Sequence, residues 1–152
     1  MSSLLVQSCS ATKNEVPEPV PALELYDGYF FRIIKKAIRE QDFRSDLDMR
    51  ILSAKYGIVD PNEQIEYYDQ RMTTDRANEL RSSVATSLST IVTKNDYDRI
   101  IVNTSETYIE ALEKFLQRSD IKVSKIDGDG IGTKGKLLKE FVRGETEIGV
   151  TA

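Results

Sequence analysis

The chain has 152 residues, of which 39% are hydrophobic and 30% are charged, a balance typical of one globular domain with its own core. Its formal net charge of −4 excludes a general attraction to nucleic-acid phosphates, and it has no apolar run near the roughly 20 residues that a membrane helix needs. With no histidine and one cysteine, the sequence excludes a histidine-based catalytic triad, an internal disulfide and a Cys/His zinc site. We therefore expect a cytoplasmic protein with no membrane partner, no metal and no other cofactor.

The first half of the chain predicts strand, helix, strand and loop in that order. Leu4–Gln7 is a short apolar run typical of a buried strand, and the prolines that follow it mark a loop. Apolar residues at three- and four-residue spacing predict a helix over 25–40. Met49–Ser53 is the second predicted strand, and residues 62–72, which have no clear period, are interpreted as an ordered loop.

The second half repeats the alternation twice more. A long apolar stripe predicts a helix over 74–92, followed by a strand over 98–103. A polar stretch then precedes a helix predicted over 106–117. The last two predicted elements are a strand over 121–126 and a helix over 134–142.

Strands separated by helices of this length favour parallel pairing, because a parallel connection requires a crossover. We therefore predict an α/β fold, a three-layer sandwich with a mainly parallel sheet of about four strands flanked by helices. Residues 1–143 are expected to form one domain, and 144–152, which are poor in apolar residues, a flexible tail.

Polar residues follow three of the predicted strands. In open α/β sheets the ligand crevice lies at the carboxyl ends of the strands, so these residues are expected to converge there. Hydroxyls, an amide and lysines beside apolar strands are typical of a small-ligand pocket. The candidate ligand-binding residues are Ser8, Ser10, Thr12, Tyr26, Ser53, Lys55, Tyr56, Tyr68, Asn103 and Thr104.

Three side chains are candidates for chemistry. Lys13 follows the first strand and is either a solvated loop lysine, a charge partner for an anion or an amine nucleophile. Cys9 is either an inert core residue or a nucleophile whose thiol would need Lys13, Lys55 or backbone amides beside it. Asp69, next to two tyrosines, is an acid or base in a lid over the pocket, or part of a packed loop.

Two further patterns have plainer interpretations. Gly128–Lys136 imitates a phosphate loop, but Leu137 replaces the Ser or Thr that would hold magnesium, so a turn into the last helix is favoured. Basic residues between Arg32 and Arg39 have helical spacing, which favours a solvated helix face over a nucleic-acid patch.

The sequence blocks together resemble a family of small α/β proteins distantly related to the peroxide-stress protein YaaA. The resemblance covers most of the chain up to about Tyr108. It lies in Cys9-Ser10-x-Thr12-Lys13, Glu24-Leu25-Tyr26-x-Gly28, Leu52 to Pro61, Tyr68-Asp69 and Gly128-x-Gly130-Ile131-Gly132. Folds of this kind have been compared with uracil-DNA glycosylases, so the resemblance implies a nucleobase or nucleoside in the crevice.

A narrower resemblance is to archaeosine synthase, through the spacing Cys9-x-x-x-Lys13. The corresponding lysine of that enzyme attacks the nitrile of a 7-deazaguanine base in transfer RNA. Its motif continues with Pro-Tyr, a serine and a histidine, whereas this chain continues Asn14-Glu15-Val16-Pro17. The resemblance therefore implies a lysine-centred site without implying the same reaction.

The leading hypothesis is an enzyme-like domain that binds or modifies a nucleobase, nucleoside or nucleotide. Lys13 is its nucleophile or electrostatic catalyst, Lys55 binds an anionic group and Asn103 reads a base edge through its amide. One alternative is a non-catalytic DNA- or RNA-binding module of a stress response that uses the basic helix face. Another is a degenerate relative kept for protein contacts.

Overall fold

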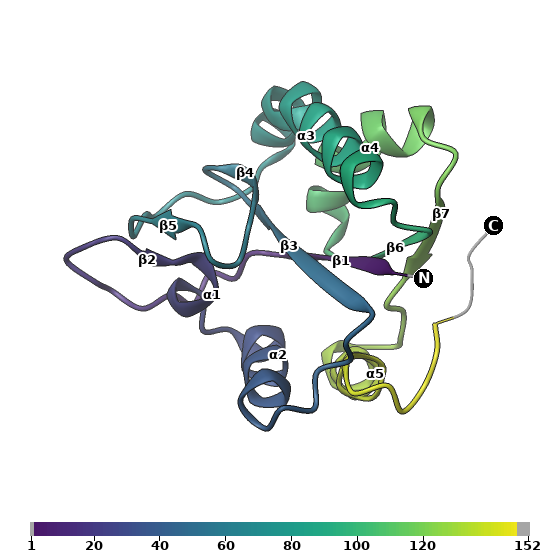
Figure 1. Ribbon diagram of the computed structural model, residues 1–152. Coiled ribbons are helices and arrows are strands. Elements are labelled where there is room, and N and C mark those ends of the chain that lie inside the picture. The colour runs from purple at the N-terminus through teal and green to yellow at the C-terminus, as the bar shows by residue number, and fades with distance from the viewer. Residues whose placement is uncertain (1, 149–152) are drawn as a thin grey trace.

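A five-stranded sheet forms the centre of the protein, for which a computed structural model describes residues 2–148 (Figure 1). Its strand order is β4-β3-β1-β6-β7. The strands are β1 (Ser3–Ser8), β3 (Leu47–Ser53), β4 (Gly57–Val59), β6 (Arg99–Asn103) and β7 (Lys122–Lys125). Strands β3, β1, β6 and β7 are parallel, and β4 joins the edge by antiparallel pairing with β3. The sheet is therefore mainly parallel, as predicted.

The central strand β1 is buried on both faces. Leu4, Leu5 and Val6 are fully buried, which explains why β1 is a continuous apolar run without alternation. Its side chains divide the core in two, because Leu5 packs with one hydrophobic cluster while Leu4 and Val6 pack with the other.

Helices cover both faces of the sheet and complete the three-layer sandwich (Figure 1). Helices α2 (Tyr29–Arg39) and α5 (Ile131–Val142) pack together on the face reached by Leu5. Helices α3 (Thr74–Asn95) and α4 (Glu106–Arg118) pack together on the opposite face. Each pair buries one apolar stripe against the sheet, as the helical spacing of the sequence predicts.

A small substructure lies beside the carboxyl end of β1 (Figure 1). It consists of the short helix α1 (Ala22–Leu25) and the antiparallel pair β2 (Val20–Pro21) and β5 (Gln64–Ile65). The pairing brings the proline-rich loop and the loop before α3 together. Residues 62–72, predicted as an ordered loop, therefore include one short strand.

The predicted helix over 25–40 is wrong at its start. The chain forms α1, leaves helical geometry at Tyr26 and begins α2 only at Tyr29. The physical reason lies outside this segment: Tyr26 pairs with Lys13 in an antiparallel bridge, and the Asp27 amide donates to the Thr12 carbonyl oxygen. Backbone groups that bond to the first loop cannot also continue a helix.

Two other differences concern short elements and a helix end. Sequence periodicity did not predict β4, which follows a turn at Gly57, where φ is +75° and glycine is favoured. Helix α5 begins at Ile131, three residues before the predicted start.

The described part of the expected tail packs on the domain. Ile148 is buried, and Glu147 pairs with Arg44 and Arg99. Residues 149–152 lie outside the described residues.

No helix among the described residues is both long and apolar enough to span a bilayer.

Two glycines of α5 provide a matched test of the packing between α2 and α5. A Cβ at Gly135 would clash with the Tyr29 hydroxyl oxygen, whereas a Cβ at Gly132 would meet nothing within 4 Å. Gly132→Ala is expected to raise the free energy of unfolding by up to about 1 kcal/mol through helix propensity. Gly135→Ala is expected to gain less than Gly132→Ala, because the half-exposed Tyr29 ring must move away from the new Cβ and loses part of its packing.

Urea unfolding of both variants checks this expectation, and Tyr29→Ala/Gly135→Ala serves as the relief variant. Equal stability of the two single variants would show that Tyr29 does not hold the two helices together.

Candidate functional site

The main cavity, with a volume of about 730 Å³, lies at the carboxyl edge of the sheet. Its walls come from the ends of β1 and β6, the starts of α2, α4 and α5, and the glycine-containing loop before α5. Five of the predicted ligand-binding residues line it: Ser8, Ser10, Thr12, Asn103 and Thr104. The rule that places ligand crevices at this edge therefore leads to a real cavity.

Two buried amide side chains form the floor of this main cavity. Gln7 and Asn103 are 1% and 3% exposed, and they face each other from neighbouring strands. Asn103 Nδ2 donates to Gln7 Oε1 at 2.9 Å, and Gln7 Nε2 donates to the Asn103 carbonyl oxygen at 3.2 Å. Such a pair keeps both side chains in fixed orientations.

The Asn103 amide is only half satisfied. Within residues 2–148, no hydrogen bond reaches its side-chain oxygen, which is not one of the fully buried atoms without a partner and is therefore accessible from the main cavity that the residue lines. An accessible acceptor in a fixed orientation at a cavity floor is available to a ligand or to water. The floor therefore offers a fixed hydrogen-bond acceptor.

The rim of the main cavity is apolar. Tyr29 and Phe30 at the start of α2 pack against each other with ring centroids 5.5 Å apart, and both line the cavity. Ile131 at the start of α5 is 62% exposed and borders the same opening. A polar floor beneath an apolar rim suits a flat ligand with hydrogen-bonding groups along one edge.

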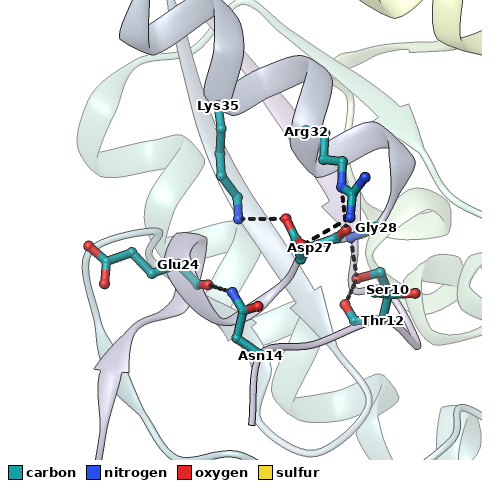
Figure 2. Close-up of polar contacts among 8 residues, drawn as sticks. All are labelled: Ser10, Thr12, Asn14, Glu24, Asp27, Gly28, Arg32 and Lys35. Carbon is teal, nitrogen blue, oxygen red and sulfur yellow. Dashed lines mark hydrogen bonds and ion pairs between the residues drawn. The ribbon is translucent and has the colours of Figure 1, made fainter. Parts of the chain in front are cut away.

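The loop after β1 is held against the segment before α2 by a chain of hydrogen bonds (Figure 2). The Ser10 hydroxyl donates to the Thr12 carbonyl oxygen at 2.6 Å and accepts from the Gly28 amide at 3.2 Å. Asn14 Nδ2 donates to the Glu24 carbonyl oxygen at 2.8 Å. Through these two hydrogen bonds, Ser10 positions the loop relative to the start of α2.

Asp27 attaches this loop junction to α2 through two cations (Figure 2). Its carboxylate lies 3.2 Å from Arg32 and 3.7 Å from Lys35. The hydrogen bond from Arg32 lowers the pKa of Asp27, while partial burial lowers the pKa of Lys35. Arg32 and Lys35, two residues of the basic helix face, thus form ion pairs with Asp27.

Lys13 lies in a second, smaller cavity of about 370 Å³. Cys9, Asp69 and Arg71 line the same cavity, so all three predicted chemical side chains, Cys9, Lys13 and Asp69, are brought together. Lys13 Nζ stands over the Tyr68 ring, 4.7 Å from its centroid, where the ring face attracts a cation. This Lys13 cavity is therefore a charged compartment.

Cys9 borders both cavities. Together with Ser10 and Tyr108 it forms the wall that the main cavity and the Lys13 cavity share. The Cys9 Sγ atom lies 2.9 Å from the Tyr108 hydroxyl. Burial is the main cause that raises the pKa of Tyr108, and the nearby Cys9 is the second. The Cys9 thiol is thus paired with the Tyr108 phenol. Among the described residues, no hydrogen bond joins the thiol to Lys13 or to Lys55.

Three predicted binding residues instead form a hydroxyl cluster behind the cavities. The Tyr26 hydroxyl lies 2.7 Å from that of Tyr68, and both contact Ser53 Oγ, at 3.2 Å and 2.9 Å. Burial raises the pKa of Tyr26 and of Tyr68. None of the three lines the main cavity or the Lys13 cavity, so the structure places them in the core.

Lys55 and Tyr56 lie on the turn between β3 and β4, and neither borders the main cavity or the Lys13 cavity. Their amides donate to Ser53 Oγ, and Arg76 donates to the Ala54 and Lys55 carbonyl oxygens at 2.7 Å. The exposed Lys55 Nζ lies 5.2 Å from the Tyr56 ring centroid. The structure therefore separates Lys55 from Lys13.

Sequence reasoning missed Gln7, Tyr29, Tyr108 and Lys134 as residues of the site. A polar Gln7 inside an otherwise apolar strand was a usable signal, because buried glutamine needs a partner. Tyr29, Tyr108 and Lys134 are on helices that look like ordinary amphipathic elements. Only the tertiary arrangement turns the starts of those helices toward the strand ends.

Among the described residues, no group of three or more His, Cys, Asp or Glu side chains is placed to hold a metal ion.

The fold and the cavity define the class: a three-layer α/β sandwich with a divided, polar crevice at the carboxyl ends of its parallel strands. Within this class the chain belongs to a family of unknown function, DUF6884, which matches residues 4–140. Comparison with curated proteins gives no match.

One similar solved structure is described as the crystal structure of AF0587, a protein of unknown function. It superposes with a TM-score of 0.55 at 13% sequence identity, over 92% of this chain and 44% of that one. The chain thus spans less than half the length of that protein, and the likeness shows the fold alone.

The buried phenols predict a loss of stability at alkaline pH. Their pKa values are raised above the ordinary value of about 10, so the folded protein keeps protons that the unfolded chain releases. The free energy of unfolding is therefore expected to fall as pH rises past about 10, by up to about 1.4 kcal/mol per pH unit for each phenol. Urea unfolding at pH 8 to 11 measures this slope, and Tyr68→Phe is expected to flatten it. An unchanged slope in that variant would remove Tyr68 as a cause.

Disruption of the hydroxyl cluster is also expected to lower the free energy of unfolding at neutral pH. Ser53→Ala leaves two buried phenols and the Lys55 and Tyr56 amides without their shared partner, and is expected to lower the free energy of unfolding by about 1–3 kcal/mol. Ser82→Ala, at a side chain whose contact with Lys114 is exposed, is the control. Equal stability of the two variants would contradict a structural role for the cluster.

Proposed function

We propose that this protein binds a small molecule carrying a nucleobase, as a free base, nucleoside or nucleotide, with the base in the main cavity. The observation that carries the proposal is the Asn103 side chain, which is buried, fixed by Gln7 and left with an unpaired oxygen at the cavity floor. An amide in a fixed orientation is well suited to read a base edge, because it offers an acceptor and a donor side by side.

Size and shape support the same ligand class. A volume of about 730 Å³ lies within the range of about 300–1,000 Å³ that is usual for pockets that hold small ligands. Tyr29 and Phe30 give the opening aromatic surface, and aromatic faces stack on bases of any sequence. A flat heterocycle would therefore meet apolar contacts at the rim and hydrogen bonds at the floor.

Lys13 supplies the charge in the neighbouring compartment. Its ammonium group is held over the Tyr68 ring, and this favours a role as an electrostatic catalyst over a role as a nucleophile. Asp69 borders the same cavity and is the candidate for proton transfer. Cys9 and Tyr108, in the shared wall, separate this pair from the ligand cavity and would contact a ligand that spans both.

The geometry gives less support to a DNA- or RNA-binding module. Arg32 and Lys35 are both paired with Asp27, so half of the expected basic face of α2 is neutralised within the molecule. The exposed Ile38 lies between the remaining cations, Lys36 and Arg39. A surface that tracks phosphates needs a continuous row of free cations.

Ligand binding can be tested by thermal shift and calorimetry with a panel of purines, 7-deazapurines, pyrimidines, nucleosides and nucleotides. A ligand at a hundredfold excess over its Kd should stabilise the wild type by about 2.7 kcal/mol. Asn103→Ser is expected to weaken binding of that ligand, because the amide is lost while the position stays polar. Lys13→Ala is expected to change turnover or affinity, and Lys55→Ala, outside both cavities, to leave both unchanged.

Circular dichroism confirms that each variant is folded before binding is compared. Failure of every panel member to stabilise the wild type would contradict the proposal. Unaltered binding by folded Asn103→Ser would remove the base-reading role from Asn103.

A further inference from the structure

Lys134 is a half-buried lysine without a carboxylate partner. It lines the main cavity and also an adjoining cavity of about 240 Å³, and no ion pair within residues 2–148 includes it. Lys35, the other lysine of similar burial on this face, pairs with Asp27. A lysine that is partly shielded from water and has no ion-pair partner is suited to bind an anion.

Three helices begin at the same cavity. Helices α2, α4 and α5 are preceded by Gly28, Ser105 and Gly130, and all three residues line the main cavity. None of the three residues caps its helix by a side-chain hydrogen bond. By contrast, α3 begins elsewhere and is capped by the Thr73 hydroxyl. Uncapped helix starts present unpaired amide donors and the positive end of the helix dipole.

Two further polar groups at the same place lack partners. The side-chain oxygen of Asn103, a residue 97% removed from solvent, receives no hydrogen bond from any described residue and faces the main cavity. The hydroxyl of Thr104, which lines both the main and the adjoining cavity, is also buried without a partner. An enclosed hydroxyl and an accessible amide oxygen, both without a partner beside uncapped helix starts, leave hydrogen-bonding groups that a ligand can complete.

Three carboxylates line the two cavities that Lys134 borders. Asp129 lines the main cavity, and Asp127 and Glu106 line the adjoining one. The Asp127 carboxylate is occupied in part by the Gly128 amide, at 2.9 Å. Neither Asp129 nor Asp127 lies within ion-pair distance of Lys134 among the residues described, so its charge remains free for a ligand.

We propose that the main cavity binds a nucleoside monophosphate, with its phosphate held by Lys134 and the amide donors that begin α5. This inference rests on the proposed function, because it assigns the base to Asn103 and adds an anionic group beside Lys134, which lines the same cavity. Helix starts and a lysine are the usual donors for phosphate.

The test compares nucleosides with their 5′-monophosphates by calorimetry, using AMP, GMP, CMP and UMP as probes. Wild type is expected to bind at least one monophosphate roughly tenfold more tightly than the matching nucleoside, because a hydrogen bond to a charged group is lost in the nucleoside. Lys134→Gln is expected to erase that tenfold difference while leaving nucleoside affinity unchanged. Lys136→Gln, on the same helix but exposed and outside the cavity, is expected to retain it.

The outcomes separate this inference from the proposed function. Equal affinity for nucleoside and monophosphate, or a Lys134→Gln variant that keeps the preference, overturns the phosphate site and leaves base binding intact. Tighter binding of a single-stranded oligonucleotide than of any monophosphate overturns the assignment to a free nucleotide. If neither nucleosides nor nucleotides bind, the proposed function itself fails.

Discussion

The site depends on the antiparallel contact between the loop after β1 and the segment before α2. The Lys13–Tyr26 bridge and the Ser10 hydroxyl, which links Thr12 to Gly28, fix this contact. It has three consequences: α1 and α2 are separate helices, α2 begins at the crevice, and Lys13 is turned away from the main cavity toward Tyr68. A Cβ on Gly28 would lie 2.6 Å from Ser10 Cβ, so the close approach requires glycine at this point.

The same contact divides one crevice into two compartments of different character. The main cavity has neutral amides at its floor and aromatic rings at its rim, with Asp129 and Lys134 near the start of α5, whereas the Lys13 cavity is lined by Lys13, Asp69 and Arg71 without an amide pair. Cys9, Ser10 and Tyr108 stand between them. Recognition of an uncharged ring and stabilisation of a developing charge make opposite demands on local polarity, and under the proposed function the wall would separate the two.

Local sequence patterns predicted the layers but not the details of the site. Strand runs and helical stripes are set by burial on the sheet, so the α/β sandwich and the position of Asn103 at a strand end followed from periodicity. The break at Tyr26 and the edge strand β4 depend on partners distant in the sequence or on a single glycine, which periodicity does not reveal. Ser53 and Tyr26 were candidate ligand contacts because they are polar and near strand ends, yet their hydroxyls satisfy each other in the core.

Polar residues near strand ends therefore fall into two physical groups, which only the hydrogen-bond inventory separates. Ser10, Ser53 and Tyr26 have partners for their hydroxyls and contribute to structure. Asn103, Thr104 and Lys134 each keep a group without a partner among the described residues, and all three line the main cavity. Of the fully buried side-chain atoms without a partner among the described residues, only the Thr104 hydroxyl belongs to a residue that lines this cavity. The Asn103 oxygen and the Lys134 ammonium group are not enclosed in this way, so the cavity leaves them accessible. The first group sets the shape of the site, and under the proposed function the second is available to a ligand.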